Sequence, residues 1–316
     1  MENSSSQVKN TKNKKDFKGF LLAFGAVFFW SFNVIFAHIL KTELTPIQIA
    51  FFRWLIAALA FLPFTAEKIW NNRTILLNNW KIVLILSFFG IALSNTFVYQ
   101  ASYTSTAVDM ALIGTSGPIF LIFFARLFLG ISVSRNQILG ILCALAGVVT
   151  IITDGSLKQL EDFRFAVGDF WMLGTAVTFG FYGAMQEKIK PLNIPAFALL
   201  PATIILATLM LLPFFLLSLE NAPLTSVSPT GWKIILFLGV GNSAVAYIAW
   251  NISIRIIGSL KSSIIYYLMP VLSTIEAYFI LGEQIAPAQM YGGLLVLTGI
   301  ILTTVHSKHR FTLHRT

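Results

Sequence analysis

Two charged side chains lie inside long apolar stretches of this sequence. Glu276 falls within residues 266–283, YYLMPVLSTIEAYFILGE, and Arg53 falls within the apolar run that follows Pro46. A charge at the centre of a lipid bilayer costs roughly 3 kcal/mol or more, so an intramembrane charge indicates a functional role. A guanidinium can hold a carboxylate through two parallel hydrogen bonds. A buried carboxylate can pair with an ammonium group or carry a proton.

The residues around Glu276 form one polar face of a helix. Five of them recur at spacings of 4, 3, 4 and 3 residues, which places them on one side of an α-helix: Ser262, Tyr266, Met269, Ser273 and Glu276. Pro270 cannot donate a backbone hydrogen bond and interrupts the helix beside this face. Pro118 interrupts an earlier apolar segment in the same way. The polar face is therefore expected to line a cavity rather than lipid.

Arg53 and Glu276 are expected at matching depths. Arg53 lies roughly 10 Å from the nearer end of its helix, and Glu276 roughly 8 Å from the same membrane side, at about 1.5 Å per residue. Two opposite charges at one depth would ease each other's burial. The alternatives are a static ion pair without a functional role, and an arginine whose guanidinium extends to the membrane surface.

Asparagine and aromatic side chains recur at helical spacing in four other segments. Such side chains combine an apolar body with a hydrogen-bonding end, as ligand pockets need. For any single aromatic residue the alternative is ordinary helix packing. The candidate pocket residues from these segments are Trp30, Asn33, Asn95, Tyr99, Phe179, Tyr182, Tyr247 and Asn251.

The elements that must position these residues are membrane-spanning helices. The chain is 56% hydrophobic and only 11% charged, whereas about a quarter of the residues of a soluble domain are charged. A membrane-spanning helix needs about 20 apolar residues. Ten segments fit this length: 18–40, 46–65, 81–102, 107–129, 135–153, 166–187, 195–218, 232–254, 259–281 and 286–306. The sequence thus predicts an all-α integral membrane protein with ten transmembrane helices.

The basic residues set the predicted orientation. Lysines and arginines gather before the first segment, after each even-numbered segment and at the C-terminus. Of the 22 basic residues, those on the other side are Lys41, Arg53, Lys158, Arg164 and Lys233. Such a bias marks cytoplasmic loops, so both termini are predicted to be cytoplasmic, and a nucleic-acid surface is excluded. Residues 1–16 and 307–316 are expected to be basic cytoplasmic tails, the first of them disordered.

The second half of the chain repeats the first. Residues 80–149 align with 232–301 without a gap, 152 positions apart, so that Gly140 matches Gly292 and Gly147 matches Gly299. The two helices before them align at an offset of 149. Each half, 17–153 and 166–306, holds five predicted helices, and an odd number inverts the second half in the membrane. Inverted repeats with interrupted helices are typical of secondary transporters.

The repeated motifs resemble those of the EamA-type members of the drug/metabolite transporter superfamily. The second copy is the fuller one: Pro270, Leu281, Gly282, Glu283, Gln289, Gly292 and Gly299. The first copy has Pro118, Leu129, Gly130, Gln137, Gly140 and Gly147, with Ile131 where the family often has a glutamate. The resemblance covers nearly all of residues 17–306. It implies a multi-pass carrier of metabolites in the bacterial inner membrane, commonly for amino acids and often acting in export.

These features together predict a secondary transporter that works by alternating access, and the family resemblance implies export. An amino acid or a related zwitterion fits Arg53, Glu276 and the aromatic residues. The alternative within the superfamily is a multidrug exporter of lipophilic cations. The alternative from another class is an integral-membrane lipid-modifying enzyme, which would need clustered acid–base or metal groups. The four histidines form no such cluster: His38, His306, His309 and His314.

No cofactor and no metal are expected. The expected partners are a small metabolite and membrane lipids, with a coupling proton as an option. Five glycines are expected to let helices approach closely: Gly140, Gly147, Gly292, Gly293 and Gly299. Monomer and homodimer both remain open.

The predicted orientation can be tested by cysteine labelling. In a background without Cys143, which is the single cysteine, cysteines at Ser6 and Ser307 should react only with reagents that enter the cytoplasm. A cysteine at Ser156 should react from outside, because the basic bias places this segment on the other side. Labelling of position 307 from outside in intact cells would overturn the even number of spans.

Overall fold

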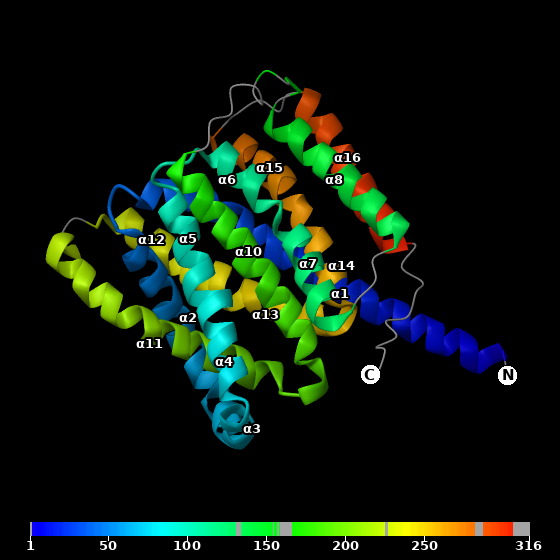
Figure 1. Ribbon diagram of the computed structural model, residues 1–316, viewed down its shortest axis with the longest axis horizontal. Helices are drawn as coiled ribbons and strands as arrows, with labels where there is room; N and C mark the ends of the chain where they lie inside the picture. The colour runs from blue at the N-terminus through cyan, green and yellow to red at the C-terminus, as the bar shows by residue number, and fades with distance from the viewer. Residues whose placement is uncertain are drawn as a thin grey trace.

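The computed structural model describes residues 2–130, 134–153, 155–156, 158, 166–224, 227–281 and 287–305, and this part of the chain is helical without strands (Figure 1). Each of the ten apolar segments found in the sequence is occupied by a helix or by a helix built from shorter pieces. By length and composition, five helices of the described part could cross a membrane: 14–40, 46–71, 80–101, 196–221 and 229–257. Several predicted residues lie outside this part: Ile131, Gly282, Glu283, His306, His309, His314 and the tail 307–316.

The first half contains eight α-helical pieces and one π-helical piece among the described residues. In chain order they are α1 (Glu2–Leu40), α2 (Pro46–Asn71), α3 (Arg73–Asn78), α4 (Trp80–Ser87), η1 (Phe88–Leu93), α5 (Ser94–Ala101), α6 (Ala107–Gly114), α7 (Gly117–Leu129) and α8 (Arg135–Ile152). The expectation of a disordered tail is wrong for residues 2–16, because α1 begins at Glu2. Neither glycine nor proline occurs before Gly19 to stop the helix.

The second half has a corresponding order of pieces. They are α10 (Val167–Lys188), η2 (Lys190–Leu192), α11 (Ala196–Asn221), α12 (Pro229–Phe237), η4 (Leu238–Val245), α13 (Ala246–Ile257), α14 (Ser259–Ile265), η5 (Tyr266–Leu268), α15 (Met269–Leu281) and α16 (Pro287–Val305).

The two prolines singled out in the sequence lie just after changes in helix geometry. α6 ends at Gly114, and α7 begins at Gly117 with Pro118 in its first turn. Pro270 lies in the first turn of α15, directly after the 3₁₀ turn η5. Proline is well accommodated at the start of a helix because its missing N–H is not needed there. The irregular backbone therefore precedes each proline rather than being centred on it.

Two π-helical pieces, η1 and η4, interrupt the third and the eighth apolar segments. Residues 88–93 align with 240–245 at the offset of 152, so the two pieces occupy corresponding positions. π-Helical segments are rare and are frequently found at functional sites. The sequence analysis did not predict them, because hydropathy and spacing do not distinguish a π-turn from an α-turn.

α8 and α16 form a closely packed pair at one edge of the molecule (Figure 1). A Cβ added at Gly147 would lie 2.5 Å from the carbonyl oxygen of Gly292, and one added at Gly292 would lie 2.7 Å from that of Gly147. Gly140 and Gly299 face each other in the same way. Glycines therefore allow the two helix backbones to touch, as the sequence predicted for these four positions. The same prediction is wrong for Gly293, where an added Cβ would meet only Val271 Cγ1, at an ordinary distance of 3.8 Å.

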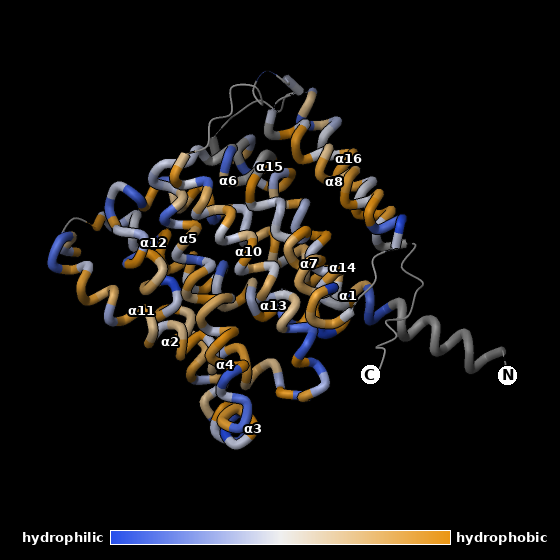
Figure 2. The backbone as a smooth tube through the Cα atoms, in the orientation of Figure 1, coloured by the Kyte–Doolittle hydropathy of each residue, from blue (hydrophilic) through white to orange (hydrophobic). Residues whose placement is uncertain are grey.

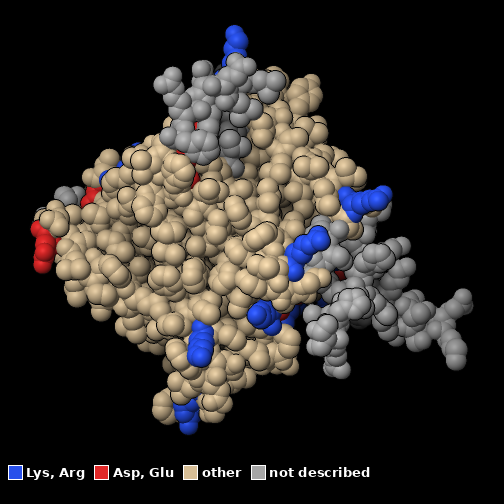
Figure 3. All heavy atoms as spheres, viewed as in Figure 1, with Lys and Arg blue, Asp and Glu red and all other residues tan. Residues whose placement is uncertain are grey.

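The outer surface is apolar over a broad area. Orange segments dominate the helices in Figure 2, and charged side chains are few on the face shown in Figure 3. Large apolar side chains point outward, such as Phe64 and Phe279, which are 77% and 78% exposed. The most deeply buried large side chains include Arg53, Tyr99 and Tyr182. This pattern, apolar outside and partly polar inside, fits a protein embedded in lipid.

Gly147→Ala should destabilise the protein by about 1–3 kcal/mol, because the new methyl group overlaps the backbone of α16. The matched control is Gly25→Ala in α1, where an added Cβ meets nothing within 4 Å. That change should be neutral or stabilising by up to about 1 kcal/mol, since alanine favours a helix over glycine. Thermal unfolding of both purified variants measures the difference. Equal stability of the two would contradict the close packing.

Candidate functional site

A cavity of about 60 Å³ lies where helices of the two halves meet. Its walls come from α1, α2, α5 and α6 of the first half and from α10, α13, η5 and α15 of the second. This volume admits a few water molecules but is far below the several hundred Å³ of a usual ligand pocket. The predicted site residues in its lining are Trp30, Asn33, Arg53, Asn95, Phe179, Tyr247 and Tyr266.

Arg53 is the centre of a buried polar network, which we call the Arg53 cluster. Its guanidinium donates through Nη1 to Tyr99 OH at 2.8 Å and to Asn33 Oδ1 at 3.2 Å, through Nη2 to Asn242 O at 3.3 Å, and through Nε to Ser243 Oγ. Arg53 is 1% exposed, yet every one of these acceptors is neutral. A buried charge held only by neutral dipoles remains able to bind an anion.

The local backbone explains how these acceptors reach Arg53. A capping box at Thr45 and Gln48 fixes the start of α2, and α2 packs against η4. The π-helical turn η4 supplies Asn242 and Ser243, which the sequence analysis missed. The carbonyl oxygen of Asn242 also accepts a bond of 2.9 Å from Trp30 Nε1. The short polar run Gly241–Ser243 inside an apolar segment could have identified these residues as candidates. Helical spacing, however, did not indicate that they face Arg53.

A second network, the Gln186 cluster, lies in the other half. Tyr182 OH donates to Asn251 Oδ1 at 3.0 Å, and Gln186 Nε2 donates to Tyr182 OH at 2.8 Å and to Asn251 Oδ1 at 2.6 Å. These residues do not line the main cavity; Asn251 borders a smaller one of about 10 Å³. Tyr182 and Asn251 therefore belong to a polar core rather than to the cavity surface in this conformation.

The two clusters have the same plan. Tyr182 and Asn251 stand at the positions that align with Asn33 and Tyr99, and Asn33 accepts a bond of 3.1 Å from Tyr99 OH. Each half thus pairs one asparagine with one tyrosine, with their helices exchanged. A guanidinium donates to the pair in the first half and a neutral amide in the second. The positive charge is the feature that distinguishes the first cluster.

Asn95 and Tyr247 connect the halves between these clusters. Asn95 Nδ2 donates to Tyr247 OH at 3.0 Å, and the two residues are 152 positions apart. They occupy equivalent positions of the repeat, so this contact joins a position to its own counterpart.

Aromatic rings enclose one side of the cavity around Trp30. The Trp30 ring centroid lies 5.7 Å from Phe179, 5.2 Å from Tyr247 and 6.3 Å from Tyr266. Trp250, which the sequence analysis did not select, is closest at 5.1 Å. Together these five residues form an aromatic group that could contact an apolar or cationic side chain.

Glu276 lies in a separate place. It is 6% exposed, its Oε1 is hydrogen-bonded to Ser31 Oγ, and its Oε2 has no hydrogen-bond partner. Ser273 Oγ donates to Ser31 O at 3.2 Å, which adds a second link between α15 and α1. Neither Glu276 nor Ser273 lines the cavity.

The structure does not pair Arg53 with Glu276. The ion pair found among the described residues joins Lys190 to Glu187. Helical rise gives the depth of a residue but not the side of the bundle that it faces. Both residues contact α1, Arg53 through Asn33 and Glu276 through Ser31.

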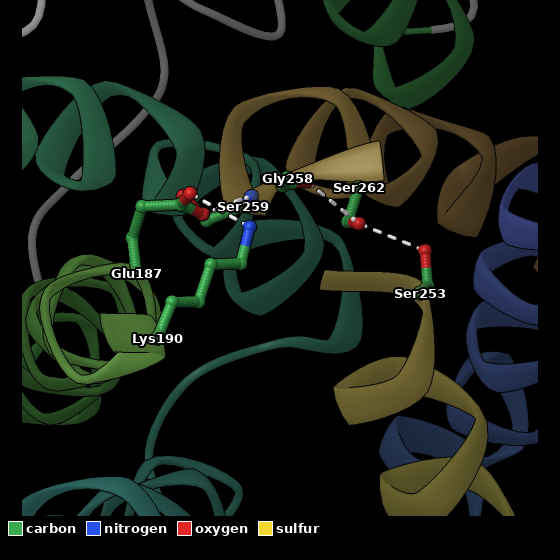
Figure 4. A network of polar contacts seen from close by, with 6 residues as sticks. All are labelled: Glu187, Lys190, Ser253, Gly258, Ser259 and Ser262. Carbon is green, nitrogen blue, oxygen red and sulfur yellow. Dashed lines mark hydrogen bonds and ion pairs between the residues drawn. The ribbon is translucent and has the colours of Figure 1, made fainter. Parts of the chain in front are cut away.

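A further polar group holds the end of α10 against the start of α14 (Figure 4). Glu187 accepts bonds from Lys190 Nζ at 2.7 Å and from Ser259 N at 2.9 Å. Beside it, Ser253 Oγ and Ser262 Oγ are 2.8 Å apart. This group ties the end of one helix to the beginning of another.

A corresponding group holds the end of α1. His38 Nε2 lies 3.3 Å from Ser105 O, and Lys41 Nζ donates to Ser102 O at 3.0 Å. Positions 38 and 41 align with 187 and 190 at the offset of 149. Each half therefore fastens the end of its first helix to the part of the chain where its third apolar segment ends and its fourth begins.

Comparisons with known proteins show the family. The sequence profile of the EamA-like transporter family matches residues 17–153 and again 166–305. The chain belongs to this family, so it is a transporter homologue of the multi-pass membrane type. Its family membership implies a small-molecule substrate and a non-enzymatic function.

Several named relatives are similar to the chain. One from Bacillus subtilis, "Uncharacterized transporter YyaM", is 27% identical over 69% of this chain and 71% of its own length. One from Archaeoglobus fulgidus, an "Uncharacterized transporter", is 26% identical over 87% and 93%. One from Streptantibioticus cattleyicolor, "Probable terminal-alkyne amino-acid exporter", is 26% identical over 58% and 60%. A solved crystal structure with 18% identity matches 91% of this chain and 96% of its own with a TM-score of 0.73, which shows the fold.

The separation of the two charges can be tested by a double-mutant cycle. Arg53→Gln should lower the free energy of unfolding by about 1–3 kcal/mol, because several buried acceptors lose their donor. Since Arg53 and Glu276 share no hydrogen-bond partner, the effects of Arg53→Gln and Glu276→Gln should add in the double variant. Thermal unfolding of the three variants measures this. A coupling above about 1 kcal/mol would show that the two residues act on each other, either directly or through α1.

Proposed function

We propose that this protein is a secondary transporter that carries an amino acid or a closely related zwitterion out of the cell across the bacterial inner membrane. The observation that carries the proposal is Arg53, a guanidinium buried beside a cavity between the two halves and held by neutral acceptors. A substrate carboxylate could take the place of two of these acceptors in a bidentate pair. The described conformation, whose cavity measures about 60 Å³, is then a contracted state of the transporter.

The proposed architecture is ten membrane-spanning helices in two inverted repeats, with both termini cytoplasmic. Three observations support it. Helices occupy all ten apolar segments, and π-helical pieces stand at corresponding positions of both halves. Gly140 packs against Gly299, which is the counterpart of Gly147, and Gly147 packs against Gly292, which is the counterpart of Gly140. Such crossed contacts are what a two-fold relation between the halves would produce. The bias of basic residues supports the orientation.

The substrate class follows from the chemistry of the cavity. Arg53 provides a partner for a carboxylate, and the aromatic group around Trp30 provides a surface for an apolar or aromatic side chain. The oxygens of Asn33, Asn95 and Tyr247 can accept hydrogen bonds from an ammonium group. Glu276 was expected to bind the ammonium, but its position outside the cavity favours another role. The name of the Streptantibioticus relative, an amino-acid exporter, agrees with this class and with export.

Alternating access would require the two ends of the cavity to open in turn. We propose that the contacts of His38 and of Glu187 act as closures at opposite ends. They occupy aligned positions, and each fastens the end of a helix that lines the cavity, α1 or α10. Release of one set while the other remains would open the cavity to one side.

A multidrug exporter of lipophilic cations is the second candidate. The aromatic group favours it, because a cation can bind over aromatic faces. Arg53 opposes it, since a buried guanidinium repels a cation unless an anion accompanies it. The response of transport to loss of Arg53 therefore separates the two candidates.

The proposal is tested by counterflow of labelled amino acids in proteoliposomes. Wild-type protein should catalyse exchange, and Arg53→Ala should reduce it roughly 10- to 100-fold, as expected for loss of a charged hydrogen bond worth about 1.5–3 kcal/mol. Arg53→Lys should recover only part of the rate, because an ammonium cannot form the bidentate pair.

The matched control is Arg126→Ala, which removes an exposed arginine of α7 outside the cavity and should leave exchange unchanged. Ethidium efflux is measured beside it. Intact ethidium efflux in wild type and Arg53→Ala, without amino-acid exchange in either, would replace the amino-acid proposal by the multidrug candidate.

A further inference from the structure

The hydroxyl group of Ser31 lies between two oxygen atoms. Its Oγ is 2.6 Å from the backbone oxygen of Phe28 and within hydrogen-bonding distance of Glu276 Oε1. A serine hydroxyl has one hydrogen to donate and two lone pairs to accept with. Phe28 O can only accept, so two ordinary two-centre hydrogen bonds at these short distances need two hydrogens. Ser31 supplies one of them.

We infer that Glu276 carries a proton in this conformation and is the coupling-proton site of the transporter, separate from the substrate cavity. The proton sits on Oε1 and is donated to Ser31 Oγ, and Ser31 in turn donates its own hydrogen to Phe28 O. This assignment gives every contact one hydrogen. The coupling role of Glu276 rests on the proposed function, whereas its protonation follows from the contacts of Ser31.

The second oxygen of Glu276 supports the assignment. Oε2 is buried and has no hydrogen-bond partner. In a protonated carboxyl group this atom is a neutral carbonyl oxygen, whereas in a carboxylate it shares the negative charge. An unpaired neutral oxygen is far less costly to bury than an unpaired anionic one.

The surroundings of Glu276 offer no positive partner for an ionised form. α15 packs against α1, α8, η5 and α16. In the described part of these elements, no ion pair or hydrogen bond joins an ionisable side chain to Glu276. The ionisable residues concerned are Lys14, Lys15, Asp16, Lys18 and His38 of α1, Arg135 and Cys143 of α8, Tyr266 and Tyr267 of η5, Tyr278 of α15, and Tyr291 of α16.

Loss of the proton would change the link between α1 and α15. The single hydrogen of Ser31 would turn from Phe28 O to the carboxylate, and the unpaired Oε2 would then need water or another donor. The ionised form should therefore favour a conformation in which Glu276 is better hydrated. This gives a physical route from proton release to movement of α15 relative to α1.

Infrared spectroscopy of the purified protein in lipid nanodiscs tests the protonation without any substrate. At neutral pH the wild type should show the C=O stretch of a protonated carboxyl group, shifted in deuterated water. Glu276→Gln should remove this band. Ser31→Ala should keep the band but shift it, because the proton loses its acceptor.

The matched control is Glu43→Gln. Both oxygens of Glu43 accept hydrogen bonds from Ser228, at 2.9 and 2.8 Å, as an ionised carboxylate would. Its replacement should leave the band unchanged. Absence of the band in the wild type, or its persistence in Glu276→Gln, would overturn the inference.

Transport measurements then test the coupling. In proteoliposomes, an imposed pH gradient should drive accumulation of labelled amino acid by the wild type. Glu276→Gln, which cannot release a proton, should lose the response to the gradient, and its counterflow rate, measured beside it, separates loss of coupling from loss of transport. A wild type that exchanges amino acids without responding to pH would overturn the coupling role alone. A wild type without any exchange would instead contradict the proposed function, and the infrared band would still decide the protonation.

Discussion

The burial of one guanidinium group governs the arrangement of the helices around it. An unpaired buried donor costs about 1–3 kcal/mol, and more when it is charged. Arg53 is 1% exposed, so its donors must find acceptors within the protein. They find them on three other elements: Asn33 on α1, Tyr99 on α5, and Asn242 with Ser243 on η4. The need to satisfy Arg53 therefore draws helices of both halves to one point, and the cavity lies beside that point.

The second half contains the same kind of asparagine–tyrosine pair without a charged donor. There the asparagine–tyrosine pair receives its hydrogen bonds from Gln186, a neutral amide on the same helix as Tyr182. A neutral network can be complete with three side chains, so it forms a closed polar core away from the main cavity. The charged network needs acceptors from several elements and stays next to the cavity. Divergence between two similar halves has thus left one buried positive charge rather than two.

Much of the helical arrangement could be predicted from the sequence, but less of the site. Apolar length located the ten helical segments, and the prolines marked, to within a few residues, the changes of helix geometry at 115–116 and 266–268. Spacing along the chain does not report the π-turns, which rotate Ser243 and Asn242 toward Arg53. It also gives depth without direction, so Arg53 and Glu276 looked like partners although they contact different residues of α1. Tyr99 was predicted as a pocket residue, and the structure makes it a hydrogen-bond partner of Arg53 outside the cavity lining.

α1 is the element through which the two charged residues can influence each other. Ser31 and Asn33 are about 200° apart around the helix at about 100° per residue, so they face opposite sides of α1. One contacts Glu276 and the other contacts Arg53, while Trp30 beside them lies in the cavity wall. On the proposed roles of the two residues, a shift of α1 that follows proton release at Glu276 would move Asn33 relative to Arg53. By linkage, a carboxylate that displaces Asn33 at Arg53 would then change the proton affinity at Glu276 by the same coupling free energy. Coupling between proton and substrate then needs no contact between them, only a helix that is held on both sides.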